Sequence, residues 1–394
     1  MSQHRPPPRV LVVSGSRADY GLLRPVMEAL DADPAFELLV LVTGMHLEER
    51  FGSTWRAFDD DGFSISARVP TDLADDEEET IAAAMGRGIA GCARTYQELA
   101  PDLVLLLGDR FEILAAASAA LVCRVPVAHL CGGDVTEGAW DEGIRHAITK
   151  MSHLHFPTHD AAAARIVAMG ESPARVFAVG STGIDALVAL DRMSRAELER
   201  DLGFALRRRN LLITYHPETL ATGGATEDID QLLAALDAIN ARDDDIGMLF
   251  TFPNADAGGT EIRERIEEFV ARNANAGSWT SLGQTRYLSL MGEADVVVGN
   301  SSSGLYEAPS LRTATVNIGG RQDGRPRAAS VISVVAVKHA IVQALDDALA
   351  LDCSATVSPY GDGHATGRVV AALAAIHDFP GLLRKGFHEL AEQR

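Results

Sequence analysis

Residues 294–307, ADVVVGNSSSGLYE, contain the pattern from which the fold of the whole chain can be inferred. An apolar run of strand length passes directly into glycine and small polar residues, and then into a helix-compatible segment. A strand that turns into a helix leaves unpaired backbone N–H groups at the helix start, and these groups suit an anion such as a diphosphate. Glu307 lies about one helical turn beyond Ser303, where a carboxylate can bind two ribose hydroxyls. The stretch therefore predicts a nucleotide-diphosphate cradle without a P-loop lysine.

The same alternation of strand and helix patterns fills the first half of the chain. Short, nearly all-apolar runs occur at Arg9–Ser14, Glu37–Val42, Asp102–Leu107, Pro126–Leu130 and Arg175–Val179. Helix-length runs separate them, at Leu22–Ala32, Thr80–Leu99, Ile113–Cys123, Asp141–Met151 and Asp160–Met169. Strands that are apolar on both faces belong in a parallel sheet covered by helices. The pattern predicts a doubly wound, Rossmann-like α/β domain.

A polar, charged segment after Asp191 predicts the connection to a second domain, because the alternation restarts beyond it. Strands are expected at Asn210–Tyr215, Ile246–Phe250, Asp295–Val298, Ala314–Ile318 and Val331–Val334, and helices at Asp228–Ala241, Thr260–Arg272, Arg286–Met291, Lys338–Leu351 and Gly367–Ile376. We therefore predict Rossmann-like domains over residues 1–190 and 210–375, a linker over 191–209, and a C-terminal helix over 376–394 that packs back on the first domain. Tandem domains of this type place their strand ends across an interdomain cleft, where ligands bind.

Composition narrows the classes of function. The 394 residues suffice for two domains, and the net charge of −20 argues against nucleic-acid or anionic-membrane partners. The N-terminal MSQHRPPPRV has no apolar signal region, and the longest apolar stretch, Ile113–Cys123, is too short to span a bilayer. The four cysteines show no CxxC or metal-ligand spacing. These features predict a reduced, cytoplasmic protein.

Charged residues follow the predicted strands of the first domain. In GSRADYG (15–21), Arg17 is suited to a phosphate, although an ordinary turn with a surface arginine has the same pattern. GDRFE (108–112) places three charged residues at a strand exit, where burial without partners is costly. The alternative is a helix cap with a surface arginine. The position at the expected cleft edge favours a functional role for this segment.

The segment CGGDVTEGAWDEGIRH (131–146) combines several carboxylates with basic groups directly after a buried strand. Helical spacing places Asp141 and Arg145 on one face, and it allows a structural pair between Glu142 and His146. Asp134 lies closer to the strand end. Carboxylates beside a dry cleft are candidates for proton transfer at a carbon next to an electron-withdrawing group.

In the second domain, His216 follows a predicted strand and is a candidate phosphate donor, although a histidine before proline is often structural. The segment FPNADAGG (252–259) follows the next strand. The chain contains no H-E-x-x-H, P-loop or G-x-S-x-G motif and no metal-ligand set.

Together, these motifs resemble those of the hydrolysing UDP-N-acetylglucosamine 2-epimerases. The resemblance rests on GSRADYG, GDRFE, the DExIRHAITKMSHLHF pattern from Asp141 to Phe156, FPNADAG, and GNSSSGLYE with NIGGRQDGR (317–325). It covers nearly the whole chain in the same order. It implies two Rossmann-like domains of the kind found in sugar-nucleotide glycosyltransferases, and an enzyme that starts sialic acid synthesis.

The resemblance also implies a mechanism and a set of site residues. UDP-N-acetylglucosamine would lose its C2 proton, UDP would leave by anti elimination, and water would add to give N-acetylmannosamine. Matching positions imply Asp109 and Asp141 as acid and base; Arg17, Arg110 and His216 on the diphosphate; and Asn254, Ser301, Ser302, Glu307 and Arg321 around the nucleotide and ribose. No metal or redox cofactor is implied, and the family suggests a homodimer or homotetramer.

One departure affects the expected substrate. Family members specific for UDP-N-acetylglucosamine carry a catalytic Glu where this chain has Cys131, and Glu137 resembles an inserted residue. The local pattern is similar to the branch acting on 2,4-diacetamido-2,4,6-trideoxy sugars, on the route to legionaminic acid. A thiol replaces a carboxylate base only if its pKa is depressed. Glu137 or Asp134 is therefore the candidate replacement.

Four alternatives stay open at this point. The chain could be a hydrolysing 2-epimerase specific for UDP- or GDP-linked N,N'-diacetylbacillosamine. It could be a non-hydrolysing epimerase, which adds UDP back, although DExIRHAITKMSH favours the hydrolysing branch. A two-domain glycosyltransferase would share the fold but would not explain the acid/base carboxylates. A catalytically inactive sugar-nucleotide sensor would explain Cys131.

Overall fold

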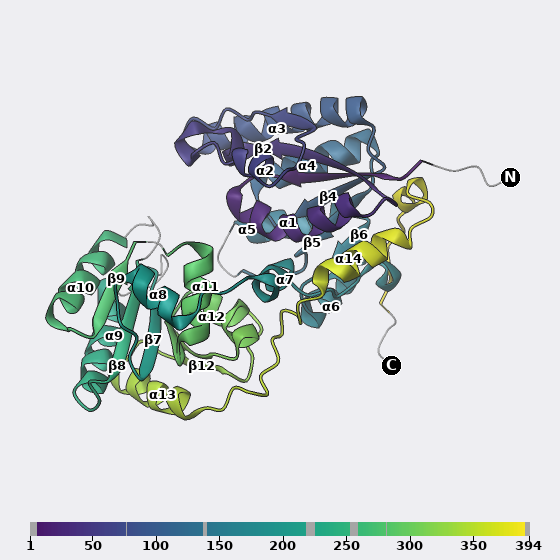
Figure 1. Cartoon of the computed structure of the whole chain (residues 1–394). Helices are drawn as coiled ribbons and strands as arrows, with labels where there is room; N and C mark the ends of the chain where they lie inside the picture. The colour runs from purple at the N-terminus through teal and green to yellow at the C-terminus, as the bar shows by residue number, and fades with distance from the viewer. Residues whose placement is uncertain are drawn as a thin grey trace. The chain divides into compact units, whose positions relative to one another are not determined.

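The chain folds into two compact units, which are described separately (Figure 1). The computed structural model describes residues 6–75, 77–136, 140–217, 225–252, 259–280 and 282–390. The first unit contains the chain up to Ala186 together with the segment from Tyr360 onward, and the second contains Leu187–Pro359.

The first unit is built on a six-stranded parallel sheet in the order β3-β2-β1-β4-β5-β6. Its strands are β1 (Arg9–Ser14), β2 (Glu37–Thr43), β3 (Ala67–Val69), β4 (Leu103–Leu107), β5 (Val127–Leu130) and β6 (Leu154–Phe156). In the central register, Leu11 pairs with Leu39 of β2 and Val104 of β4. All residues of β4, β5 and β6 are buried, as the all-apolar runs predicted for a sheet covered on both faces.

Helices cover both faces of this sheet (Figure 1). The helices are α1 (Arg17–Ala32), α2 (Arg56–Asp60), α3 (Glu78–Leu99), α4 (Phe111–Cys123), α5 (Asp141–Met151), α6 (Asp160–Ala168), α14 (Ala365–Ala374) and α7 (Thr182–Ala189), which crosses the unit boundary. One core cluster joins α1, α2 and α14 to the sheet. Another joins α3, α4 and α5 to it. Each helix therefore buries one apolar stripe, which accounts for much of the folding free energy.

The second unit repeats the plan with a six-stranded parallel sheet in the order β12-β11-β10-β7-β8-β9. Its strands are β7 (Arg209–Thr214), β8 (Ile246–Thr251), β9 (Ala276–Trp279), β10 (Val296–Gly299), β11 (Ala314–Ile318) and β12 (Val331–Val334). Its helices are α8 (Arg195–Leu202), α9 (Ala225–Asn240), α10 (Gly259–Arg272), α11 (Gly283–Glu293), α12 (Ser303–Tyr306) and α13 (Lys338–Ala350). Helices α9, α10 and α13 pack into one core cluster, whereas α11 contributes to another.

The strand orders locate the expected ligand positions. In each sheet, the strand that comes first in the chain lies at the centre, and the later strands lie first on one side of it and then on the other. The strand order therefore reverses between β1 and β4 and between β7 and β10. Open α/β sheets bind ligands outside the carboxyl ends of the strands at such a switch point. The predicted doubly wound fold is thus confirmed in both units.

Four differences from the predicted elements are informative. The Arg175–Val179 run forms no strand: a 3₁₀ turn covers Pro173–Arg175, and Val176 makes only an isolated bridge to His155. Strands β3, β6 and β9 were not predicted. Each has three or four residues and is an edge strand of its sheet, so it carries no long apolar run.

The last helix lies in a different unit from the one predicted. Residues 365–374 were expected in the second domain, but α14 packs against α1 in the first unit. Both oxygens of Asp185 accept hydrogen bonds at its start, from the backbone N–H groups of Ala365 (3.0 Å) and Thr366 (2.6 Å). An amphipathic pattern predicts a helix but does not specify the sheet that covers it. In place of the helix expected over 376–394, the described residues contain a short 3₁₀ turn, Pro380–Leu383.

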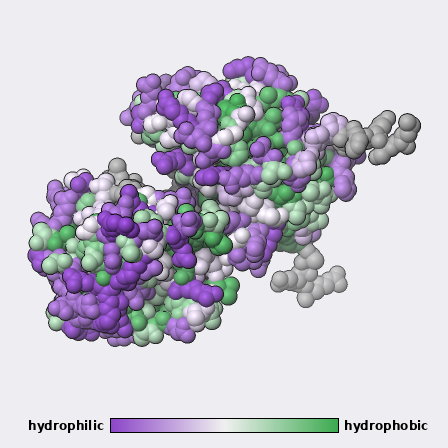
Figure 2. Space-filling view, viewed as in Figure 1, coloured by the Kyte–Doolittle hydropathy of each residue, from purple (hydrophilic) through white to green (hydrophobic). Residues whose placement is uncertain are grey.

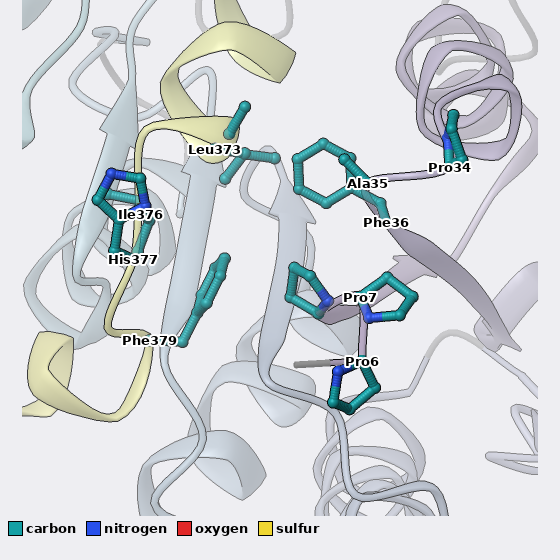
Figure 3. Close-up of a pocket in the computed structure, with 11 residues that line it drawn as sticks. Pro6, Pro7, Pro34, Ala35, Phe36, Leu373, Ile376, His377 and Phe379 are labelled. Carbon is teal, nitrogen blue, oxygen red and sulfur yellow. The ribbon is translucent and has the colours of Figure 1, made fainter. Parts of the chain in front are cut away.

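An apolar hollow of about 420 Å³ lies where the N-terminal prolines meet the segment after α14 (Figure 3). Pro6–Pro8 and Phe36 line it from one side, and Leu373, Ile376 and Phe379 from the other. Pro8 and Phe36 precede β1 and β2, so the hollow is at the amino ends of the strands. It therefore lies at the opposite edge from the switch point and is not the expected ligand position.

The visible surface is mainly hydrophilic, with smaller apolar areas (Figure 2). Among the described residues, none of the helices has the length and apolar character needed to cross a membrane.

Candidate functional site

The carboxyl end of β4 holds the central ion pair of the first unit. Arg145, in the second turn of α5, is only 6% exposed and donates a hydrogen bond from Nη2 to Asp109 Oδ2. Its other donors reach Glu142 Oε2 (2.9 Å), Thr136 Oγ1 (3.0 Å) and the Asp134 carbonyl (3.0 Å). One buried guanidinium thus joins the loops after β4 and β5 to helix α5. Charge-assisted hydrogen bonds from one guanidinium to two carboxylates fix its geometry.

Asp141, the first residue of α5, lies within electrostatic reach of this pair. Burial is the main reason that the pKa of Asp141 is raised, and the negative charge of Asp109 raises it further. Arg110 and Arg145 oppose this shift. A carboxyl group with a raised pKa within electrostatic reach of a second carboxylate is an arrangement that can serve acid/base catalysis. The structure therefore brings together the two carboxylates predicted as acid and base.

Glu142 has the structural role that the spacing allowed. Its Oε1 lies 2.9 Å from His146 Nε2, one turn later on α5, and its Oε2 accepts the Thr136 backbone N–H at 2.7 Å. These contacts tie the loop after β5 to the helix. Asp141 makes no such pair with Arg145, which turns to Asp109 instead.

The β1 loop and the start of α4 form a second charged group. Arg110 donates from Nε to Glu112 Oε1 at 2.8 Å and from Nη2 to Met45 Sδ at 3.0 Å. Asp19 is buried beside them, and burial raises its pKa to about 6 although Arg110 opposes the shift. Arg17 is exposed at the first position of α1. Arg17 and Arg110 are thus both at the switch-point ends of β1 and β4.

At the end of β5, Cys131 has a left-handed backbone, with φ of 62°. Burial, and to a lesser degree the charges of Asp134 and Asp109, raise the pKa of its thiol far above the ordinary value. The Cys131 thiol is therefore protonated at neutral pH and is not the missing base. Asp134 accepts from Thr158 Oγ1 at 3.1 Å and lies 3.0 Å from His159 Nε2. Glu137, the other candidate, lies outside the described residues.

The second unit contains a polar hollow of about 390 Å³ at the carboxyl ends of its central strands. It is lined by Thr214, His216, Thr251, Phe252, Thr280, Leu282, Gly283, Gln284, Tyr287, Leu288, Ser301, Ser303 and Glu307. Ser303 Oγ lies 2.7 Å from the Tyr287 hydroxyl and 3.0 Å from Ser301 Oγ. Hydroxyl groups therefore gather beside Glu307, on the segment predicted to cradle a diphosphate.

Glu307 lines this hollow, and one of its carboxylate oxygens has no hydrogen-bond partner among the described residues. Its Oε2 is buried and makes no hydrogen bond within the described part of the chain. Burial raises the pKa of Glu307 to about 7. A buried, unsatisfied acceptor is costly unless a ligand donates to it. Such an acceptor suits the hydroxyls of a ribose.

Asn300 organises the β7 and β10 ends. Its side chain accepts the His216 backbone N–H at 2.7 Å and donates to the His216 carbonyl at 2.8 Å. Its own carbonyl accepts from Arg321 Nη1 at 3.1 Å. At Gly299, with φ of 129°, an added Cβ would lie 2.0 Å from the Thr214 carbonyl oxygen, so only glycine permits this approach of β10 to β7.

The other predicted residues differ in placement. Ser302 stands at the N-cap position of α12, a helix of only four residues, without a side-chain capping bond, and it does not line the hollow, whereas Ser301 does. Asn254 lies outside the described residues. The described residues include no group of three or more His, Cys, Asp or Glu side chains arranged to hold a metal ion.

Sequence reasoning missed Arg145, Asn300 and Tyr287 as site residues. Arg145 had a visible signal, since it shares a helix face with Asp141 just after a strand-end loop. Asn300 and Tyr287 act through contacts distant in sequence, with His216 and Ser303 respectively. No local spacing rule predicts such contacts.

Two doubly wound sheets, one with paired carboxylates at its switch point and one with a polar hollow suited to a nucleotide, define a two-Rossmann protein that acts on sugar nucleotides. The family model of UDP-N-acetylglucosamine 2-epimerase matches residues 28–374. The chain belongs to this family and is a sugar-nucleotide 2-epimerase.

Two relatives are similar over most of their length. The chain is 37% identical over 325 residues to GDP/UDP-N,N'-diacetylbacillosamine 2-epimerase (hydrolyzing) of Campylobacter jejuni, covering 82% of this chain and 83% of that protein. It is 35% identical over 368 residues to the UDP-N,N'-diacetylbacillosamine 2-epimerase (hydrolyzing) of Legionella pneumophila, covering 93% and 96%. In fold, it is similar to the UDP-GlcNAc 2-epimerase of Neisseria meningitidis bound to UDP-GlcNAc, with a TM-score of 0.74, 18% identity and coverage of 93% and 99%.

Proposed function

We propose that this protein is a hydrolysing 2-epimerase, which converts a nucleotide-linked 2-acetamido sugar to the free manno-configured sugar and a nucleoside diphosphate. The observation that carries the proposal is the pair Asp109 and Asp141, with Arg145 bound to Asp109 and a raised pKa at Asp141. Two carboxyl groups within electrostatic reach of one another, one of them with a raised pKa, match the removal and return of a proton at C2.

In the proposed reaction, the Asp109 carboxylate removes the C2 proton. The C2–H electrons form a C1–C2 double bond as the C1–O bond breaks, and the diphosphate leaves with that electron pair. Water then adds its oxygen to C1, while protonated Asp141 delivers a proton to C2 from the opposite face and recovers one from the water. Asp109 finally releases its proton to solvent. The net change consumes one water.

The second unit is proposed to bind the nucleotide. Glu307 would accept hydrogen bonds from the ribose hydroxyls, and Ser301 and Asn254 would line the nucleotide site. Arg17, Arg110 and His216 would bind the diphosphate, with Arg321 completing the pocket. The polar hollow and the unpartnered Glu307 oxygen support this assignment. We also retain the expectation of a cytoplasmic homodimer or homotetramer.

We infer that the sugar is N,N'-diacetylbacillosamine, a 2,4-diacetamido-2,4,6-trideoxy sugar, rather than N-acetylglucosamine. The names of the relatives from Campylobacter jejuni and Legionella pneumophila support this choice, whereas the UDP-N-acetylglucosamine 2-epimerase of Neisseria meningitidis is 28% identical. The product would then enter nonulosonic acid synthesis. Cys131 supports the same branch, because it stands where family members specific for UDP-N-acetylglucosamine carry a catalytic Glu.

The test is an NMR assay of the purified protein with UDP- and GDP-linked forms of both sugars. We expect free manno sugar and nucleoside diphosphate, and about a 10²-fold or larger loss of turnover in Asp141→Asn, as for removal of a general acid. Asp160→Asn is the matched control, because Asp160 is the exposed first residue of α6. A nucleotide-linked manno product would instead identify a non-hydrolysing epimerase, and binding without turnover would identify a sensor.

The replacement for the missing Glu can be assigned separately. We expect one of the two variants, Glu137→Gln or Asp134→Asn, to lower turnover by about 10²-fold and the other to change turnover little. Full turnover in Glu137→Gln would exclude Glu137, and full turnover in both would exclude this hypothesis.

A further inference from the structure

We propose that Glu112 is a positioning residue that sets the direction of the Arg110 guanidinium, and that Gly15 is glycine because Glu112 occupies the space of its missing side chain. The proposal rests on the proposed function for its catalytic consequence, because Arg110 is assigned there to the diphosphate. The geometry on which it depends does not require that function.

Glu112 is a buried acid in the first turn of α4. Its side chain is 0% exposed, whereas that of its partner Arg110 is 34% exposed. Oε1 accepts from Arg110 Nε at 2.8 Å, and Oε2 makes no hydrogen bond to any described residue. Burial raises the pKa of Glu112, and Arg110 opposes this shift. A buried carboxylate is costly to desolvate. Packing alone would be served better by an apolar side chain of similar size.

Arg110 is held on two sides. Glu112 accepts at Nε, and Met45 Sδ accepts at Nη2. The negative charges of Asp19 and Asp141 also act on the Arg110 guanidinium. Arg110 therefore lies within electrostatic reach of Asp141, an acid of the proposed reaction. A planar guanidinium held at two of its donors has a defined direction. Glu112 therefore orients Arg110 toward the carboxyl end of the sheet.

The two glycines that border Glu112 come from different strand ends. A Cβ on Gly15, after β1, would lie 2.5 Å from Glu112 Cγ. A Cβ on Gly44, after β2, would lie 2.9 Å from Glu112 Oε1. Gly44 also has a left-handed φ of 56°, so its backbone by itself favours glycine, whereas no positive φ occurs at Gly15. Space for Glu112 is thus the reason for glycine at position 15.

The motifs GSRADYG and GDRFE are therefore linked through one buried side chain. If the Glu112 side chain is removed, Arg110 loses the contact at Nε, and if only the charge of Glu112 is removed, this hydrogen bond loses its charge assistance and weakens. If the proposed function holds, the stabilisation of the leaving diphosphate weakens and kcat falls, whereas KM changes little.

The experiment combines Glu112→Gln with Arg110→Ala. We expect Glu112→Gln to lower kcat by about tenfold with a thermal midpoint within a few degrees of the parent protein, and to have no further effect in the Arg110→Ala background. Glu79→Gln, an exposed acid in the first turn of α3, is the matched control. Multiplicative losses in the double variant, or parental kcat in Glu112→Gln, would overturn the positioning role.

A second measurement does not depend on activity. The Arg110 Nε–H resonance, assigned by its loss in Arg110→Lys, is expected to exchange slowly with solvent in the parent protein and quickly in Glu112→Ala. Gly15→Ala is expected to lower the thermal midpoint in the parent protein but not in Glu112→Ala, where its Cβ has room. Equal exchange rates, or an equal cost of Gly15→Ala in both backgrounds, would contradict the proposal. If these signatures hold and no sugar nucleotide is turned over, the proposed function fails while the positioning role stands.

Discussion

At the residue scale, the two sites are marked by acids whose pKa values are raised. Asp141 and Asp19 lie in the first unit, and Glu307 lies in the second. Burial is the main cause in each case. Natural proteins retain such groups at a cost in stability when a ligand or a reaction needs them. The acids themselves were predictable from their positions after strands, but their protonation was not, because it depends on neighbours distant in sequence.

Glu307 allows a direct test of this cost. Its pKa of about 7 lies above the ordinary 4.5, so the folded state is penalised above pH 7 and not below pH 4.5. We expect Glu307→Gln to raise the thermal midpoint by a few degrees at pH 8 and to leave it unchanged at pH 4.5. The same variant should bind UDP about tenfold more weakly or worse, because charge-assisted hydrogen bonds are lost. Calorimetry of UDP binding and thermal unfolding at both pH values provide the readouts; tighter binding or a lower midpoint at pH 8 would refute the assignment.

At the element scale, the sequence predicted most strands and helices because apolar period and length are local properties. β11 (Ala314–Ile318), β12 (Val331–Val334) and α5 (Asp141–Met151) have the predicted bounds. The assignment of α14 to a unit depended on its contact with α1, which the pattern of α14 does not encode. In the same way, the contacts of the segment after β10, from Ser303 to Tyr287 and from Asn300 to His216, were not predicted.

The chain after α14 also anchors helix α5. Lys385 donates to the carbonyls of Lys150 (2.7 Å) and Ser152 (2.6 Å) at the C-terminal end of α5, and it pairs with buried Glu171 at 2.8 Å. Burial alone would raise the pKa of Glu171, but hydrogen bonds from His155, Lys150 and Lys385 outweigh it and lower the pKa to about 2. The network therefore links the C-terminal segment to the helix that carries Asp141 and Arg145.

We expect Lys385→Met to destabilise the protein by about 3 kcal/mol, because it leaves a buried charge short of a partner. Since the pKa of Glu171 is depressed from 4.5 to about 2, its contribution is fully present above pH 4.5 and is lost as the pH falls toward 2. The difference between parent and variant should therefore shrink in acid. Urea unfolding from pH 3 to pH 7 measures it, with Lys338→Met at the exposed start of α13 as the control. A cost equal to that of the control at pH 7 would show that Lys385 does not anchor α5.

At the scale of the whole molecule, the chemistry is divided between two units of the same strand order. The first unit supplies the carboxylates and arginines of the proposed proton transfer, and the second supplies the hollow suited to a nucleotide. Family membership and the two-sheet fold agree with this division.

The most direct test of the central claim is the reaction in D₂O, followed by NMR at C2 of the sugar. With UDP-N,N'-diacetylbacillosamine as substrate, we expect free manno-configured sugar carrying one deuterium at C2, together with an equal amount of UDP. Deuterium enters because the proton removed at C2 is replaced from solvent-exchanged Asp141. A free sugar that retains the original C2 proton, or UDP release without epimerisation, would contradict the account.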